Sequence, residues 1–578
     1  MKKPKKKATK VAVFFSSLIR NAYFPVELPP AITTKYFADY CRSDYAFLKT
    51  QQAGLITKTT NYETFTAPRG ATGRRNLALV HPLTQAGLSL LITQQRAKIR
   101  KHVGTSRTTL YRLDENLQAS KAFEGLDFRR WDILKAKIYS EYPFVLQADI
   151  SRFFYTMYTH SIPWAVIGKA KVKDWLASKN KKKLDKHWSN NFDVAMQSCR
   201  SRETFGIPVG PDTSRLIAEL LLAGVEQDAD LAPFLKLEKS IRLVDDFTIG
   251  FEDIATAQKC LGALRTALWK FNLQLNEEKT SILPTRAIYR PKWEIEQELL
   301  RISDSRPRLQ ERDIYRFIDA TLHFCSETKS DTPAIWAARR LSELRNVELN
   351  FSVIMEALFR LSHDFPRSMS HVSSFLINNQ HLCTDGHRTK VTAWTKAVLK
   401  RNLDHNHDFE IAWCLVVCAV LKIEIDDTGI PKSKIMPNAT IFALLGLLHE
   451  KGLLKVSLST WPWRAHLKKY GVHSEMWLPY YESVRRGWTK DKKLISAINS
   501  DPVFSKMLAA KVTFLEDLIF DAAKINLARR VFIKAEASPL KNEDGNNLSN
   551  PKFPMPKKRQ KVTRGFGDLT FEAGDLDY

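Results

Sequence analysis

No apolar stretch of the chain is long enough to cross a lipid bilayer. Residues 411–421 form an apolar run, but a membrane-spanning helix needs roughly 20 such residues. The lysine-rich start and the apolar residues 11–19 imitate a signal peptide, yet Arg20 interrupts them and no small-residue cleavage site follows. We therefore expect no membrane association, a cytoplasmic location, and a basic N-terminal arm over residues 1–30 that leads into a first helix.

Cysteine is scarce: the chain has seven cysteines in 578 residues, an odd number at scattered positions. This pattern argues against a disulfide framework and favours a reducing compartment. Cys414 and Cys418 lie one helical turn apart with His405 and His407 upstream, so a zinc site is one interpretation. The apolar residues around both cysteines favour the other interpretation, a buried helix in which cysteine acts as a small hydrophobic residue.

Acidic residues are in the minority, with 62 Asp and Glu against 89 Lys and Arg, and the formal net charge is +27. So large an excess attracts polyanions over long range, whereas a small acidic substrate needs no such field. We expect a nucleic-acid partner, RNA or DNA. The alternative is that the charge serves solubility alone.

The apolar pattern divides the chain into parts of different secondary structure. Residues 31–135 favour helices, and residues 140–285 mix helices with strands. Residues 289–540 favour stacked antiparallel helices, in a bundle or a loose repeat. Residues 541–578 hold little apolar content, which predicts a flexible tail. The predicted fold class is therefore α+β, followed by an all-α C-terminal domain.

Three carboxylates form the most informative pattern. Asp149 lies in an apolar strand over residues 144–150, and the adjacent Asp245 and Asp246 lie in an apolar hairpin over residues 241–251. Like charges repel at a partly buried strand end, and a bound divalent cation is a sufficient reason to place them there. We expect Asp149 and Asp245 to face each other and hold two Mg²⁺ or Mn²⁺ ions, with Asp246 as a lesser ligand. Such a pair of ions serves nucleotide transfer onto a polynucleotide.

Further residues in chain order complete the predicted site. Ile150 is a fourth predicted metal ligand. A turn that contains Gly206, Pro208 and Gly210 would let the backbone approach a template–primer pair closely. Lys279 would protonate the leaving pyrophosphate or neutralise its charge, and a solvated surface lysine is the alternative.

Phe154 is an aromatic residue shortly after the first carboxylate. As a wall beside the nucleotide it would exclude a ribose 2′-hydroxyl and so favour dNTPs. On an extended strand, its neighbour Phe153 must point the other way. The alternative is that Phe154 is an ordinary core residue.

Two longer strings resemble one family. Residues 158–164 read Tyr-Thr-His-Ser-Ile-Pro-Trp, and residues 206–215 read Gly-Ile-Pro-Val-Gly-Pro-Asp-Thr-Ser-Arg. Together with the carboxylates, they resemble the bacterial defence-associated reverse transcriptases of the abortive-infection and unknown-group type. The resemblance implies a right-hand polymerase core of fingers and palm over residues 31–288 and a helical domain over residues 289–540. It also implies DNA synthesis in antiphage defence, with a partner non-coding RNA, a homo-oligomer or a second subunit.

The resemblance also assigns Arg74 and Arg75 to the nucleotide triphosphate, because their planar donor groups suit phosphate; a solvated loop is the alternative. Leu243 and Val209 depart from the family pattern, in which an aromatic residue and glutamine are common. RNA-directed and template-independent DNA synthesis therefore both stay open. The rivals are a retron or intron-type reverse transcriptase and a catalytically silent RNA-binding scaffold.

A lysine cluster is the last feature of the sequence. Backbone contact and base stacking by nucleic acid are one interpretation, and a solvated loop is the other. The cluster comprises Lys179, Lys181, Lys182, Lys183 and Lys186, with Trp175 and Trp188 beside it.

Overall fold

The computed structural model describes residues 9–70, 72–111, 128–178, 180–303, 306–344, 346–426, 438–456 and 463–516. The predicted tail over residues 541–578 and the lysines at the very start lie outside these residues, as does Lys179. None of the described helices is long and apolar enough to cross a membrane.

The first part of the chain is helical, as predicted, but it also contains a β-hairpin that the sequence reading missed. Thr9 caps the first helix by accepting a hydrogen bond from the backbone N–H of Ala12, and Phe15 and Ile19 of that helix are buried. This helix therefore belongs to the core. The elements are α1 (Lys10–Ala22), α2 (Lys35–Ser43), α3 (Tyr45–Thr50), α4 (Gln52–Thr57), β1 (Glu63–Arg69), β2 (Gly73–Leu79) and α5 (Pro82–Val103).

A four-stranded antiparallel sheet carries the predicted carboxylates. Its order is β4–β5–β3–β6, and both the predicted strand and the predicted hairpin are confirmed. The sequence reading missed the fourth strand, β6, which is short and only half buried. The elements are α6 (Phe128–Glu141), β3 (Phe144–Asp149), β4 (Ser240–Leu243), β5 (Asp246–Phe251), α13 (Ile254–Trp269) and β6 (Ser281–Pro284).

Helices separate β3 from β4 in the chain. The last of them, α12, follows the Gly206–Gly210 turn and is buried along almost its whole length. These helices are α7 (Phe153–Thr156), α8 (Ser161–Ile167), α9 (Lys169–Ala177), α10 (Lys181–Asp185), α11 (Trp188–Ser198) and α12 (Asp212–Val225).

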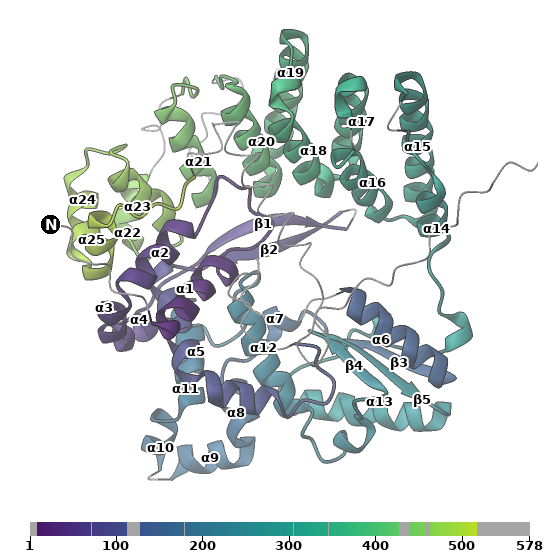
Figure 1. Cartoon of the computed structure of the whole chain (residues 1–578). Coiled ribbons are helices and arrows are strands. Elements are labelled where there is room, and N and C mark those ends of the chain that lie inside the picture. Colours follow the sequence, from purple (N-terminus) through teal and green to yellow (C-terminus); the bar gives the residue numbers. More distant parts are fainter. Residues whose placement is uncertain are drawn as a thin grey trace, which may run out of the picture.

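The predicted helical character after residue 289 is confirmed for the part that the structure describes. The helices run in an arc from the sheet back to the N-terminal helices (Figure 1). The backbone N–H of Thr33 donates to Phe514 O at 2.8 Å, which closes the arc. The helices are α14 (Lys292–Leu299), α15 (Pro307–Thr328), α16 (Thr332–Ser342), α17 (Phe351–Asp364), α18 (Met369–Asn378), α19 (Asp385–Asn402), α20 (Asp408–Leu421), α21 (Ala439–Glu450), α22 (Trp463–Tyr470), α23 (Trp477–Arg485), α24 (Lys492–Ser500) and α25 (Pro502–Ala509).

The largest hydrophobic core joins the N-terminal helices to the helical arc. It combines residues of α1, α2 and the β1–β2 hairpin with residues of the arc, and a second core lies between the sheet, α5 and α12. The indole N–H of Trp413 in α20 donates to Glu27 O at 2.9 Å across this junction. Secondary structure thus changes near residue 289, whereas the buried residues are continuous across it. The domain boundary there stays a prediction.

The helix α20 is buried on all sides, as the apolar pattern predicted. Cys414 and Cys418 are both buried in it, and the Cys414 thiol lies 3.6 Å from Thr395 O. His407 instead pairs with Asn402 through its Nδ1 atom, at 2.8 Å. The two cysteines are therefore core residues.

Candidate active site

The sheet brings Asp149 and Asp246 together. The strands β3 and β5 are antiparallel, and Asp149 lies directly opposite Asp246 in their register. Val244 and Asp245 form the two-residue turn between β4 and β5. The expectation that Asp245 faces Asp149 is therefore wrong, because the hairpin turn displaces Asp245 by one position and places Asp246 in the pair.

The turn itself is strained. Val244 has a φ of 59°, in the left-handed region that β-branched residues rarely occupy. Such a conformation costs on the order of 1–3 kcal/mol and persists only where surrounding contacts hold it. The backbone N–H of Ile150 donates to Asp245 O at 3.3 Å, so the strand end that carries Asp149 also supports the turn.

The carboxylates perturb one another. Partial desolvation of its carboxyl group, the charge of Asp245 and a hydrogen bond with Asp149 raise the pKa of Asp246 to about 6. Burial also raises the pKa of Asp245, and the charge of Asp149 adds to that effect. Each charge therefore disfavours ionisation of its neighbours, and a cation would relieve this repulsion.

Lys279 joins the same group, as its place in the sequence suggested. Its Nζ atom lies 3.2 Å from Asp149 Oδ2, and its side chain stays half exposed. The backbone N–H of Asn276 donates to Asp149 O at 2.7 Å, which anchors the segment that carries the lysine. The charge of Lys279 lowers the pKa values of Asp245 and Asp246 but does not outweigh burial and repulsion.

The structure separates the two predicted arginines. Neighbouring residues of a strand point to opposite faces. Arg74 forms a two-pronged ion pair with Glu410 of α20, at 2.7 and 2.9 Å, and so faces the helical arc. Arg75 is exposed, and its charge lowers the pKa of Asp245. Of the two, Arg75 is the one whose charge acts on a carboxylate of the site.

Phe154 lies in the short helix α7, which corrects the expectation of an extended strand there. The strand ends at Asp149, and Phe153 packs edge-on against Phe154 with ring centroids 5.5 Å apart. Phe154 is half buried, and its carbonyl accepts a hydrogen bond from the N–H of Ile207 at 2.9 Å. Phe154 thus lies against the predicted turn, and its role toward the ribose stays a prediction.

The glycines of the predicted turn serve close contacts within the protein. Gly206 has a φ of 79°, and a Cβ there would lie 3.0 Å from Tyr155 O. Gly210 has a φ of 118°, and a Cβ there would lie 2.6 Å from the ring of Pro25. Pro208 between them is buried. The turn packs against the N-terminal segment and the residues before it, and its expected approach to a template–primer pair stays a prediction.

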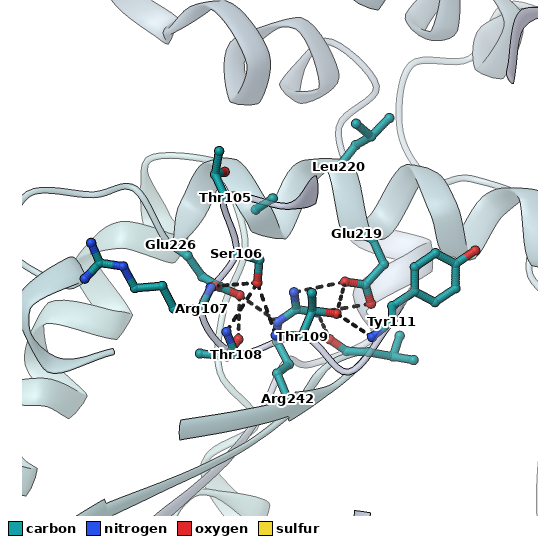
Figure 2. Close-up of polar contacts among 12 residues, drawn as sticks. Thr105, Ser106, Arg107, Thr108, Thr109, Tyr111, Glu219, Leu220, Glu226 and Arg242 are labelled. Atoms are coloured by element: carbon teal, nitrogen blue, oxygen red, sulfur yellow. Dashed lines mark hydrogen bonds and ion pairs between the residues drawn. The ribbon is translucent and has the colours of Figure 1, made fainter. Parts of the chain in front are cut away.

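Sequence reasoning missed a buried ion-pair network behind the hairpin (Figure 2). Arg242 of β4 is fully buried and bonds both Glu219 and Glu226 of α12, at 3.0 to 3.2 Å. The hydroxyls of Thr109 and Thr108 donate to the same two glutamates, at 2.8 and 2.6 Å. The only sequence signal was a charged residue within a short apolar strand.

This network holds the strained turn. The Arg242 guanidinium also donates to Val244 O at 2.8 Å, so it fixes the carbonyl that precedes Asp245. Burial alone would lower the pKa of Arg242, but Glu219 and Glu226 outweigh burial and raise it. The turn that presents Asp245 and Asp246 is thereby tied to α12, and through α12 to the Gly206–Gly210 turn.

The donor set fits a cation that is shared with a ligand. Among the described residues, no group of three or more His, Cys, Asp or Glu side chains is arranged to hold a metal ion on its own. Mg²⁺, however, is usually bound through one or two carboxylates together with water and substrate phosphates. The hydrogen-bonded pair of Asp149 and Asp246, with Asp245 beside it, offers such carboxylates. Ile150 could contribute only its backbone carbonyl.

Comparisons with known proteins give little beyond this geometry. No protein-family model matches the chain, and no curated protein matches it in sequence. Among solved structures, it is similar to apo telomerase from Candida tropicalis at 12% identity, with 62% of this chain and 68% of that chain covered and a TM-score of 0.28. It is also similar to telomerase from Candida albicans with the TWJ fragment of telomeric RNA, at 10% identity, 65% and 72% coverage and a TM-score of 0.26. Likenesses of this size carry no argument, and neither concerns a bacterial defence protein.

Proposed function

We propose that the protein is a nucleotidyltransferase that adds dNTPs to a growing DNA strand, as a reverse transcriptase of the defence-associated type. The observation that carries the proposal is the meeting of Asp149 and Asp246 on adjacent strands, with Asp245 and Lys279 beside them. Three mutually repelling carboxylates at one sheet end form a site for cations bound to polyphosphate.

Each residue has a distinct task in this proposal. Asp149, Asp245 and Asp246 would hold magnesium, which when bound activates the attacking hydroxyl and neutralises the leaving pyrophosphate. Arg75, an exposed residue of β2 whose charge acts on Asp245, would contact the triphosphate through its planar donors. Lys279 is close enough to the carboxylates to donate a proton to the leaving group.

The finer parts of the proposal rest on the sequence resemblance. Phe154 would favour dNTPs over NTPs by crowding a 2′-hydroxyl. A role in antiphage defence with a partner non-coding RNA is what the resemblance of residues 158–164 and 206–215 implies, and the departures at Leu243 and Val209 leave an RNA template or no template open. Phage plating on cells that carry the wild-type or the inactive protein tests the defence role.

The direct test measures incorporation of labelled dNTPs by purified protein with Mg²⁺. We expect the double variant Asp245→Ala, Asp246→Ala to lose incorporation by more than about 10³-fold, because the charge that binds the cations is removed. Asp230→Asn is the matched control, since Asp230 is an exposed aspartate outside the site.

A second measurement separates an inactive fold from an inactive site. Saturating Mg²⁺ stabilises a protein that binds it, by about 2.7 kcal/mol at a concentration of 100 Kd. We expect Mg²⁺ to raise the Tm of the wild type and of Asp230→Asn, but not of the double variant. Incorporation at the wild-type rate by the double variant would overturn the proposed site.

A further inference from the structure

A basic surface lies on helices that the carboxylate site does not use. It is formed by the C-terminal end of α5 and by α9 and α10, and we call it the lysine face. In Figure 1, α9 and α10 lie at the bottom of the molecule, away from the sheet that carries the carboxylates. The lysine face comprises the exposed residues Lys98, Lys101, Lys171, Lys173, Lys181, Lys182, Lys183 and Lys186.

Two segments far apart in the sequence build this face together. His187 precedes α11 and caps it by accepting a hydrogen bond from the backbone N–H of Ser189. Burial lowers the pKa of His187, and the charges of Lys98 and Lys171 lower it further. The ring centroids of His187 and Trp175 of α9 lie 6.4 Å apart, and α5 packs on α11, so the α5 and α9 lysines lie near one imidazole.

The positive charge of the lysine face is not balanced by acidic side chains. None of its lysines forms an ion pair with any residue that the structure describes, in contrast to Lys137, which pairs with Glu141 on α6. The α5 helix has no acidic residue, and α9 and α10 have only Asp174 and Asp185. Repulsion among these lysine ammonium groups is costly unless an anion with many charges offsets it.

The aromatic residues beside the lysines divide into two kinds. Trp188 is half buried and packs edge-on against the buried Phe192 of the core, with ring centroids 6.0 Å apart. Trp175 is half buried, and the Lys171 ammonium lies 5.4 Å from its ring centroid. Leu176 beside it is 51% exposed. The lysine face is thus predominantly a charged surface that includes one half-buried indole.

We propose that the lysine face binds the sugar–phosphate backbone of a nucleic acid at a place separate from the carboxylates. Lysine ammonium groups are compact point charges that meet phosphates without reading bases, so the binding is independent of sequence. The lysine face would hold one part of a nucleic acid, which could be the template, a partner RNA or the product. The end of the same strand would lie elsewhere on the protein.

This inference stands whether or not the protein transfers nucleotides, because binding is measured without catalysis. The probes are a short labelled DNA duplex and a single-stranded RNA of the same length, titrated in EDTA so that no divalent cation occupies the carboxylates. The triple variant Lys171→Ala, Lys173→Ala, Lys182→Ala removes three charges from exposed helix positions where alanine is well tolerated.

We expect the triple variant to bind roughly 10- to 100-fold more weakly at about 0.1 M salt and to reduce the salt slope of log K by about 2 to 3. Its matched control is Lys490→Ala, Lys492→Ala, Lys493→Ala. These three exposed lysines form no ion pair with a described residue and lie in and before α24, on another part of the molecule. Circular dichroism checks that both variants keep their helices.

Several outcomes would overturn the inference. Equal losses in both triple variants would show a diffuse effect of net charge and no defined face. Unchanged affinity of the Lys171→Ala, Lys173→Ala, Lys182→Ala variant for both probes would show that these lysines do not contact nucleic acid. Loss of binding to anionic lipid vesicles alone would assign the face to a membrane surface. In contrast to these outcomes, a loss of affinity for one of the two probes alone would support the inference and identify the nucleic acid as RNA or DNA.

Discussion

Two groups of acidic residues lie beside the turn of one short hairpin, and the fold compensates their charges to different degrees. Glu219 and Glu226 share the buried cation Arg242, and threonine hydroxyls donate to both of them. Among the described residues, Lys279, which is half exposed, is the one cation that pairs with Asp149. The first group is compensated within the protein, whereas the second repels itself. Acidic residues that a fold leaves uncompensated are candidates for binding a cation.

The two groups are also mechanically connected. Arg242 joins the glutamates and donates to Val244 O, and Val244 is the strained residue directly before Asp245. The buried ion pairs of Arg242 with Glu219 and Glu226 therefore help to hold the turn that carries Asp245 and Asp246. Substitutions in either group of acidic residues test this comparison.

The largest expected effect comes from removing the cation of the compensated group. Arg242→Leu leaves two glutamates buried without a positive charge, and we expect the free energy of unfolding to fall by about 3–5 kcal/mol. Urea unfolding of the wild type and the variant measures this loss. Incorporation of dNTPs should fall as well, because the turn at Val244 loses its anchor.

The matched rescue is Arg242→Leu combined with Glu219→Gln and Glu226→Gln. Neutral amides are far cheaper to bury than unpaired carboxylates, so we expect the triple variant to recover most of the lost stability. A loss below about 1 kcal/mol for Arg242→Leu alone would contradict the buried network, since a broken buried pair costs several times more.

A smaller effect of opposite sign is expected in the uncompensated group. The folded state raises the pKa of Asp246 from 3.8 to about 6, so ionised Asp246 destabilises the fold. This destabilisation is absent below about pH 3.8, grows as the pH rises through about 6, and is complete above that. Asp246→Asn should therefore raise stability at pH 8 without metal by about 1 kcal/mol, a value reduced for the exposure of this side chain.

Thermal unfolding of Asp246→Asn and of the wild type, from pH 4 to pH 8 in EDTA, measures this difference. The two proteins should approach equal Tm values at the acid end. Asp230→Asn serves again as the control, since Asp230 is exposed and lies outside the carboxylate group. A destabilised Asp246→Asn at pH 8 would show that Asp246 is compensated after all.

The sequence predicted the uncompensated group better than the compensated one, for a physical reason. Adjacent aspartates in an apolar hairpin are visible as a pattern, because repulsion there needs a purpose. The partners of Arg242 come from a helix and from the segment that includes Thr108 and Thr109, and no local period marks such long-range pairing. The apolar residues around Arg242 therefore predicted a strand and concealed the ion pairs.

Local patterns failed where tertiary contacts decide. Glycine at 206 and 210 predicted freedom of the backbone correctly, but only the folded structure shows that Tyr155 and Pro25 occupy the space. Arg74 and Arg75 were indistinguishable in sequence, and strand alternation sends Arg74 to Glu410. The exact pairing of Asp149 depended on a tight turn, which moves the register by one residue.

The smallest expected effect comes from removing the ammonium group of Lys279, which forms the weakest contact of the carboxylate group. Lys279 is the single cation paired with the carboxylates among the described residues, and its side chain is 52% exposed. Because solvent screens such a pair, Lys279→Met should lower the free energy of unfolding at pH 7 by no more than about 1 kcal/mol. Its charge also lowers the pKa values of Asp245 and Asp246, so both should titrate at higher pH in the variant. Carboxyl ¹³C NMR of aspartate-labelled protein, assigned with Asp246→Asn, measures the shift, and unchanged titration would place the lysine away from the carboxylates in solution.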